Sequence, residues 1–444
     1  MGLFKYIYSS PARFLAAGFV LMIATGTALL LLPFATVTGE ISFIDALFTA
    51  ASAVCVTGLT VVDTGTYFSV FGQLVIMFLI LAGALGFMTS ATLIFVILGR
   101  NITLKDRLII KEALNTDSMK GLVQLTLSIA RMAAVVISLG ALLLGFRFIP
   151  QLGWKRGLLF SIFHSVSAFS SAGFYLFGNF QSLTMYAGDL LVSGTILVLF
   201  VVGGLGFTVI LDIIRRKRTA KYSLHTKIVL LSTIYLLVLG TLCILLLEYN
   251  NPATLGSASA GGKIFRSLFT AATPRSGGFN VLPTEALRTP SLFFILILMF
   301  IGAAPASTGG GIKVTTFALI IGVVRALLHG SNEVVFWGKR IPSTLILKAL
   351  TIIFISLCLI FIVIFAMTIV ENKPFLALAF EVFSAFGTVG LSTGITPELT
   401  TPGKTLIIIS MYTGRLGPLT LLYALTRKLK PSGVKYPEER ILIG

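Results

Sequence analysis

The stretch FTAASAVCVTGL, residues 48–59, interrupts a chain that otherwise consists of long apolar runs. It is too short and too rich in small and β-branched residues for a membrane helix, and the run around Gly58 favours extended backbone. The same pattern returns as FHSVSAFSSAGF (163–174), FTAATPRSGGF (269–279) and FEVFSAFGTVGL (380–391). Three copies share Phe, then Ser-Ala, then a glycine ten positions after the Phe; the third copy is one residue shorter and has Thr-Pro instead of Ser-Ala. Aligned in this way, the recurring glycines are Gly58, Gly173, Gly278 and Gly390, with Gly278 taken rather than Gly277.

Composition places these motifs in a membrane. The chain of 444 residues is 56% hydrophobic and only 11% charged, whereas soluble domains average about 25% charged residues. The apolar runs are continuous rather than alternating, which predicts helical spans and not barrel strands. They lie near 14–36, 70–98, 124–149, 185–213, 226–249, 291–326, 344–370 and 404–426.

One motif lies between the two runs of each pair, which predicts four copies of a span–reentrant–span unit. The expected fold is an all-α integral membrane protein with eight transmembrane helices and four reentrant half-helices around a central pore. The predicted pore repeats are 1–100, 101–215, 216–330 and 331–428, followed by a cytoplasmic tail at 429–444.

The net charge of +18 is distributed as in a membrane protein. Segments after every second run, together with the N-terminus, hold 22 Lys and Arg against 7 Asp and Glu, whereas the other connecting segments hold nine of each sign. This positive-inside pattern predicts a multi-pass protein of the cell membrane with both termini in the cytoplasm. It explains the basic composition without nucleic acid and leaves anionic membrane lipids as expected partners.

No pattern predicts an enzyme or a resident cofactor. The three cysteines (Cys55, Cys243, Cys358) and three histidines (His164, His225, His329) form no cluster, and neither HExxH nor GxSxG occurs.

The fourfold glycine pattern suggests a cation pathway. Extended backbone at membrane depth must face protein or a water-filled channel, and four such loops around one axis can present carbonyl oxygens to a permeating ion. The alternative is a purely structural role, in which each glycine serves only helix packing or a turn. The candidate residues for a potassium-binding selectivity filter are Val56, Thr57, Gly58, Ser171, Ala172, Gly173, Ser276, Gly277, Gly278, Thr388, Val389 and Gly390.

These motifs, over essentially the whole chain, resemble the Trk/Ktr/HKT superfamily of potassium transporters, and most closely the membrane subunit of bacterial Ktr systems. The resemblance implies potassium as the substrate, one filter glycine per repeat, and a homodimer with one pore per protomer. In this superfamily glycine in the first repeat accompanies potassium selectivity, so Gly58 favours potassium. The resemblance also implies a separate cytoplasmic ring of nucleotide-binding (RCK/KTN-type) subunits, with sodium as a candidate activating or coupled ion.

The second span of the third repeat differs from the second spans of the other repeats. Its run FIGAAPASTGGGIKVTT (300–316) contains Pro305 and three consecutive glycines, which make a continuous helix improbable. The resemblance implies that this break is an intramembrane gate loop beneath the filter, on the cytoplasmic side; the alternative is a plain kinked helix. Arg415, a cation inside the last span, is expected either to brace that loop and repel cations or to form a structural salt bridge. The candidate gate residues are Ala306, Ser307, Thr308, Gly309, Gly310, Gly311, Lys313 and Arg415.

The other second spans read LAGALGFMTS (81–90), VVGGLGFTVI (201–210) and MYTGRLGPLT (411–420). Close helix packing is one explanation for their small residues around Leu-Gly, and a functional role as a repeated signal is the other. Only the second span of the third repeat is expected to be broken. The alternative to a channel-like pore is a sodium-coupled or sodium-permeable secondary transporter, a class that more often has two inverted halves with paired broken helices.

Overall fold

The computed structural model describes residues 10–86, 122–215, 222–331, 333–425 and 439. In these residues the regular structure is helical apart from one antiparallel hairpin of β1 (Val335–Phe336) and β2 (Lys339–Arg340). Four helices are long and apolar enough to cross a membrane: α2 (Pro11–Leu30), α8 (Leu122–Leu152), α12 (Leu224–Glu248) and α16 (Ser343–Val370). They are the first spans of the four predicted repeats.

A short helix follows each first span and carries the repeated motif. These half-helices are α3 (Phe43–Val54), α9 (Trp154–Phe169), α13 (Ala260–Ala272) and α17 (Phe375–Gly387). The phenylalanine that begins each motif is completely buried in all four repeats, as Phe48, Phe163, Phe269 and Phe380. The shared Phe is therefore a packing anchor that fixes the same depth for every half-helix.

The second spans are α5 (Val70–Leu85), α10 (Leu190–Gly204), α14 (Thr289–Phe300) and α18 (Thr401–Leu416). Two of them are tied to the end of their repeat's first span by a buried carboxylate. Glu371 accepts hydrogen bonds from the backbone N–H of Thr400 at 2.8 Å and from its hydroxyl at 2.7 Å. Glu248 accepts from the backbone N–H of Arg288 at 2.9 Å and from the hydroxyl of Ser291.

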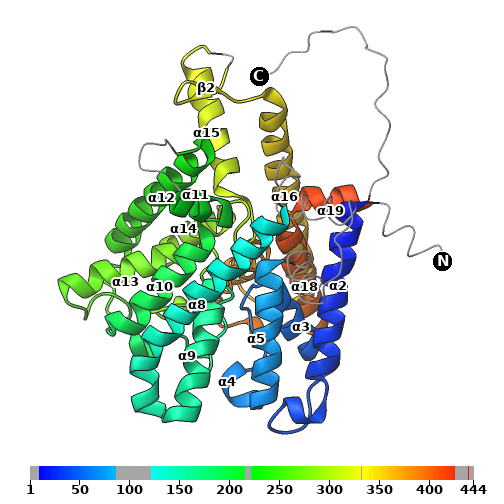
Figure 1. Cartoon of the computed structure of the whole chain (residues 1–444), viewed down its shortest axis with the longest axis vertical. Helices are drawn as coiled ribbons and strands as arrows, with labels where there is room; N and C mark the ends of the chain where they lie inside the picture. Colours follow the sequence, from blue (N-terminus) through cyan, green and yellow to red (C-terminus); the bar gives the residue numbers. More distant parts are fainter. Residues whose placement is uncertain (1–9, 87–121, 216–221, 332, 426–438, 440–444) are drawn as a thin grey trace, which may run out of the picture.

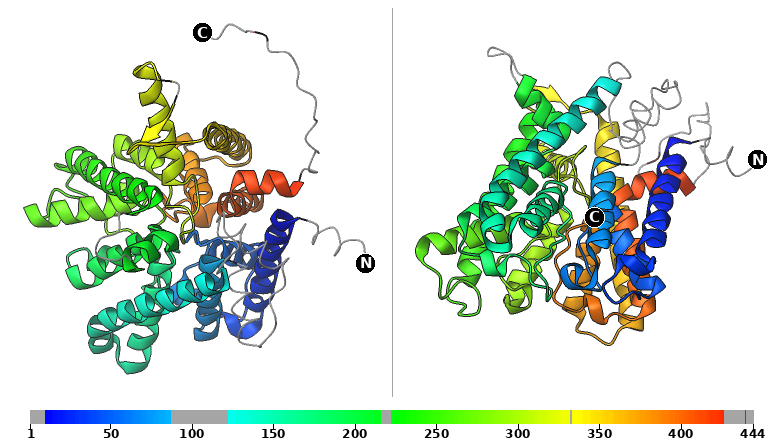
Figure 2. Two further views of the ribbon diagram at one scale, coloured as in Figure 1. Left: turned by 45° about the horizontal axis from the view of Figure 1, so that its top comes forward. Right: turned by 60° about the horizontal axis from the view of Figure 1, so that its bottom comes forward.

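Together these elements confirm the expected all-α architecture of four span–half-helix–span repeats with eight spans. In Figure 2 the repeats follow one another in chain order around a common axis. In Figure 1 α2 begins beside the helix Pro418–Leu425, and Arg13 donates a hydrogen bond to the Ala424 carbonyl at 2.8 Å. The predicted boundary at residues 100/101 and nearly all of the tail at 429–444 lie outside the described residues.

The prediction that only one second span is broken is wrong. Helix α10 bends by 98° into α11 (Phe207–Arg215), and α18 bends by 94° into α19 (Pro418–Leu425). The breaks fall at Gly206 (φ 90°) and Gly417 (φ 84°), and α5 ends at Gly86 (φ 83°). Each of these glycines follows a leucine and adopts the left-handed region that other residues avoid, so the Leu-Gly pairs terminate helices.

The close packing expected at these sequences is also present, three residues earlier. A Cβ atom on Gly83, Gly203 or Gly414 would overlap a backbone carbonyl oxygen at the end of the half-helix in the same repeat. The carbonyls belong to Val54, Phe169 and Phe386. Glycine at this position lets α5, α10 and α18 each lie directly against the half-helix of the same repeat.

Gly83→Ala should therefore destabilise the protein, because the added methyl group meets rigid backbone; overpacking of this kind costs about 1–3 kcal/mol. Gly194→Ala is the matched control, since it lies in the helical second span α10 with no atom within 4 Å of the added carbon. Thermal unfolding of the purified proteins in detergent measures the difference. Equal unfolding temperatures for the two variants would contradict this account of the packing.

Candidate functional site

The four motif loops share one backbone conformation. In each, a non-glycine residue with positive φ precedes a glycine with positive φ by two positions. The pairs are Val56 (57°) and Gly58 (90°), Ser171 (60°) and Gly173 (69°), Ser276 (70°) and Gly278 (71°), and Thr388 (48°) and Gly390 (90°). Left-handed conformations at non-glycine residues are uncommon and persist only where the surroundings enforce them. The third loop thus keeps the geometry of the others although its motif is one residue shorter, and Gly278 rather than Gly277 is the equivalent glycine.

A hydroxyl near the end of each half-helix holds the loop in place. Ser52 accepts a hydrogen bond from Gly58 N at 3.0 Å, and Ser384 accepts one from Gly390 N at 3.1 Å. In the other two repeats the hydroxyl donates instead: Ser167 to the Phe174 carbonyl at 2.7 Å and Thr273 to the Phe279 carbonyl at 2.5 Å. The serine of the Ser-Ala pair, or threonine in the third copy, therefore determines the loop conformation.

The four glycines meet in a closed ring, which we name the glycine ring (Gly58, Gly173, Gly278 and Gly390). A Cβ atom on Gly173 would lie 2.6 Å from the Cα atom of Gly278. One on Gly278 would lie 2.8 Å from the Val389 carbonyl oxygen, and Gly58 and Gly390 face the carbonyls of Ala172 and Thr57 in the same way. Each loop thus contacts the loops of the preceding and following repeats, and the ring has no room for side chains.

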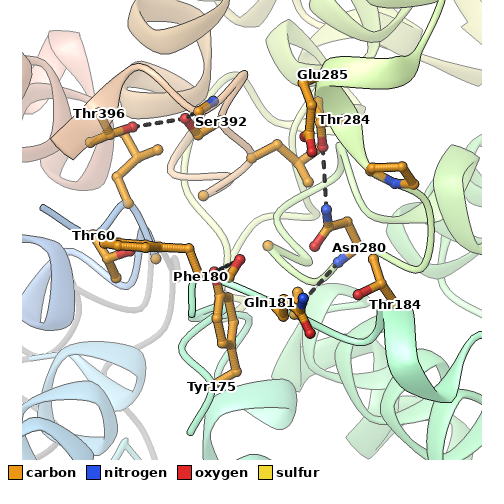
Figure 3. A pocket seen from close by; sticks show the side chains of 18 of the residues that line it. Thr60, Tyr175, Phe180, Gln181, Thr184, Asn280, Thr284, Glu285, Ser392 and Thr396 are labelled. Carbon is orange, nitrogen blue, oxygen red and sulfur yellow. Dashed lines mark hydrogen bonds between the residues drawn. The ribbon is translucent and has the colours of Figure 1, made fainter. Parts of the chain in front are cut away.

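A cavity of about 500 Å³ opens beside the glycine ring. Figure 3 shows its polar lining, with Ser392 and Thr396 of the fourth repeat opposite Asn280 and Glu285 of the third. Three of the ring glycines, Gly58, Gly278 and Gly390, also line it. We refer to this space as the outer cavity.

On the other side of the ring lies the segment between α14 and α15 (Val314–Leu328). We name residues 302–313 the crossing loop. Its base is closed by hydrogen bonds from Gly302 N to the Ile312 carbonyl at 2.8 Å and from Val314 N to the Ala303 carbonyl at 3.2 Å. The predicted break in this span is therefore a folded loop and not a simple kink.

The crossing loop touches three of the four left-handed residues beneath the ring. The Thr308 and Ser171 hydroxyls are hydrogen-bonded at 2.8 Å, and Gly310 N donates to the Thr388 hydroxyl at 2.9 Å. A Cβ atom on Gly309 would lie 2.7 Å from the Ser276 hydroxyl oxygen. The loop thus lies directly across the axis of the four repeats.

The loop also bonds to backbone groups at the broken ends of two neighbouring spans. Ala304 N donates to the Gly204 carbonyl at 3.0 Å, and Gly311 N donates to the Gly414 carbonyl at 3.4 Å. In the opposite direction, Phe207 N at the start of α11 donates to the Ala306 carbonyl at 2.7 Å. Helix ends leave such groups without partners inside the helix, and the loop supplies them.

Arg415 joins the crossing loop to the first repeat. Its guanidinium donates to the carbonyl of Thr308 in the loop and to the carbonyls of Gly83 and Ala84 at the end of α5. None of the ion pairs in the described part of the chain involves Arg415. Lys313 folds back on the loop and donates to the Gly309 carbonyl at 2.7 Å.

The sequence did not predict a role for two buried side chains beside the loops. His164 and Glu381 both directly follow the motif phenylalanine, and both accept a hydrogen bond from a backbone N–H three residues beyond a ring glycine. The signal was present, because that position is polar in every copy, as Thr49, His164, Thr270 and Glu381.

Four interrupted repeats around one axis, with a glycine ring above a crossing loop, define a polytopic membrane protein built around a single central axis. The family described as "TrkH: Cation transport protein" matches residues 14–435 of the chain. The protein belongs to this family of cation transport proteins, which are transporters and not enzymes.

Several relatives match over nearly their full length. The chain is 47% identical to the "Ktr system potassium uptake protein B" of Bacillus subtilis, covering 99% of this chain and 98% of that protein. It is 40% identical to the protein of the same name in Vibrio alginolyticus, covering 97% and 94%. It is also 40% identical to the "Potassium/sodium uptake protein NtpJ" of Enterococcus hirae, covering 98% and 97%.

Among solved structures, the potassium transporter TrkH from Vibrio parahaemolyticus matches with a TM-score of 0.73 at 19% identity, covering 93% of this chain and 85% of that one. This likeness supports the fold.

Gly390→Ala should abolish cation uptake, because the methyl group would overlap the Thr57 carbonyl and break the ring. Gly394→Ala is the control: Gly394 has a similar φ of 94° and also lines the outer cavity, but nothing lies within 4 Å of an added Cβ. Rubidium uptake is compared in cells with equal levels of the two variants. The comparison distinguishes the effect of the steric overlap in the ring from the effect of backbone strain, which both variants share. Equal losses in both variants would show that strain, not the ring contact, matters.

Proposed function

We propose that the chain carries potassium ions into the cell through one channel-like pore per protomer. The glycine ring and its loops (56–58, 171–173, 276–278 and 388–390) act as a selectivity filter for K⁺, and the crossing loop acts as an intramembrane gate. The observation that carries the proposal is the repetition of the same pair of left-handed residues in four loops that close a ring.

The filter role follows from backbone chemistry. The carboxyl ends of four half-helices lead into the ring, and these ends carry partial negative charge. Carbonyl oxygens in such loops can replace the hydration shell of an alkali cation.

The gate role follows from the position of the crossing loop. It lies under three of the four filter loops and is held by the carbonyl contacts of Arg415. An arginine that stays charged at membrane depth needs acceptors, and here the acceptors belong to the loop and to α5. Arg415 thus both anchors the loop and places a positive charge below the filter.

The relatives extend the proposal to partners and orientation. Two are named as Ktr system proteins, which supports a separate cytoplasmic ring of nucleotide-binding, RCK/KTN-type subunits and a homodimer of this chain. Basic residues gather in the segments expected on the inner side, so both termini are proposed to be cytoplasmic and in contact with anionic lipid headgroups. The chain itself needs no resident cofactor.

A sodium-permeable or sodium-coupled transporter is the second candidate, because the Enterococcus hirae relative is named a potassium/sodium uptake protein. Sodium would then be a co-substrate or an activating ion. Uptake of rubidium and sodium tracers, each with and without the other ion, in cells that lack their own potassium uptake systems distinguishes the two candidates. Rubidium uptake that is independent of sodium supports the potassium pore.

Gly58→Ser tests the filter. The new side chain would meet the Ala172 carbonyl at a backbone φ of 90°, so the oxygen positions should change and the preference for potassium over sodium should fall about tenfold, the equivalent of about 1.4 kcal/mol. Gly394→Ser, placed in open space, is the control. An unchanged K⁺/Na⁺ uptake ratio in Gly58→Ser at normal protein levels would contradict the filter.

Two changes test the gate, separately and combined: deletion of residues 306–311 and the substitution Arg415→Ala. The ends of the deleted segment are already held close by the Gly302–Ile312 and Ala303–Val314 hydrogen bonds, so the shortened chain can reconnect. Both changes should raise potassium flux severalfold, and the effect of Arg415→Ala should be smaller when the loop is absent, because the two act through a shared contact. Arg415→Lys keeps the charge but not the forked contacts, so its flux should lie between those of wild type and Arg415→Ala.

Strictly additive effects in the double variant would show that Arg415 acts independently of the loop. Loss of flux in the single Arg415→Ala variant, with the protein present in the membrane, would refute the barrier.

A further inference from the structure

In the second and fourth repeats a buried side chain of the half-helix binds the backbone N–H three residues beyond the ring glycine. We call this contact the clamp. His164 Nε2 accepts a hydrogen bond from Leu176 N at 3.2 Å, and Glu381 Oε1 accepts one from Thr393 N at 3.2 Å. Both side chains are completely buried. Because each ring glycine contacts only its two neighbouring repeats, the two clamps lie across the axis from each other.

The two clamps differ in charge. The Nδ1 atom of His164 lies 2.7 Å from the Phe160 carbonyl oxygen and must donate to it, so Nε2 is an acceptor and the imidazole is neutral. Glu381 instead accepts from three groups: the Ser392 hydroxyl at 2.5 Å, the Thr396 hydroxyl at 2.8 Å and Thr393 N. These three hydrogen bonds can stabilise an ionised carboxylate. Since His164 performs the same task without charge, the clamp itself does not need one.

Glu381 has no cationic partner among the described residues, where the ion pairs involve other acidic side chains. A buried charge without a counter-charge is costly. Two of its hydrogen-bond partners, Ser392 and Thr396, line the outer cavity next to Gly390, as Figure 3 shows for the two hydroxyl side chains. The carboxylate is thus one hydrogen bond away from the proposed ion path.

We propose that Glu381 is a fixed negative charge that sets the affinity of the outer pore mouth for alkali cations, with the transported ion as its counter-charge. Glu381 acts through space and through Ser392 and Thr396, without coordinating the ion. The inference rests on the proposed pore function. Because charge attracts potassium and sodium alike, Glu381 should control affinity and leave the choice between the two ions to the filter loops.

The experiment compares Glu381→Gln with Glu381→Asp in cells lacking their own potassium uptake. Glu381→Gln keeps the shape but removes the charge, and it should raise the half-saturation concentrations of rubidium and sodium by similar factors of about tenfold. Maximal rates should stay within about twofold, and Glu381→Asp should restore much of the affinity because it restores the charge. Glu371→Gln is the matched control, since Glu371 is another buried carboxylate that accepts from a backbone N–H and a hydroxyl, but its partner Thr400 does not line the outer cavity, unlike Ser392 and Thr396.

Wild-type half-saturation in Glu381→Gln, or a shift in the rubidium/sodium ratio as large as the shift in affinity, would overturn the inference and leave Glu381 as a clamp alone. If Glu381→Gln does not accumulate in the membrane, Glu381→His tests the same point, because histidine fills this position in the second repeat. If the proposed function itself is wrong, the result is different: the wild-type protein would give no rubidium uptake in these cells. Wild-type uptake with no effect at Glu381 would refute only the electrostatic role.

Discussion

Backbone groups without partners at membrane depth are the constraint on which this structure depends. A second span broken at glycine exposes carbonyls that lipid cannot satisfy. Here the donors come from within the protein: Ala304 N bonds to the end of α10, Gly311 N bonds to the end of α18, and Arg415 binds the carbonyls at the end of α5. The breaks, the crossing loop and the buried arginine are therefore one system, in which each part supplies partners to another.

The same constraint explains why the crossing loop lies on the axis. A loop that must reach the broken ends of α10 and α18 from its origin in the third repeat has to span the centre of the molecule. There it meets Ser171 and Thr388, whose hydroxyls offer further partners. Under the proposed function, closure of the pathway is a direct result of satisfying the backbone, and opening requires alternative partners for the same groups.

Charge is distributed unequally along the axis. Glu381 and Glu285 lie at or behind the outer cavity, whereas Lys313 and Arg415 lie on the opposite side of the ring. Under the proposed function and with Glu381 ionised, this arrangement would attract cations at the outer mouth and oppose them beneath the ring. The two basic side chains are bound to backbone carbonyls, so they add positive potential without needing acidic partners that would cancel it.

The sequence by itself determined the class of fold, the four repeats, the register of the ring glycines and a break within 300–316, because these depend on apolar length, on periodicity and on residues with restricted backbone preferences. It did not reveal that the Leu-Gly pairs at Gly206 and Gly417 end helices, since a glycine in an apolar run is compatible with packing and with a break alike. Only the tertiary structure decided which groups satisfy the freed carbonyls, including the contact of Arg415 with Thr308. It also decided that His164 and Glu381 bind equivalent backbone N–H groups in the second and fourth loops. Those contacts join residues about 10 to more than 300 positions apart, and local sequence carries no record of which distant donor meets which acceptor.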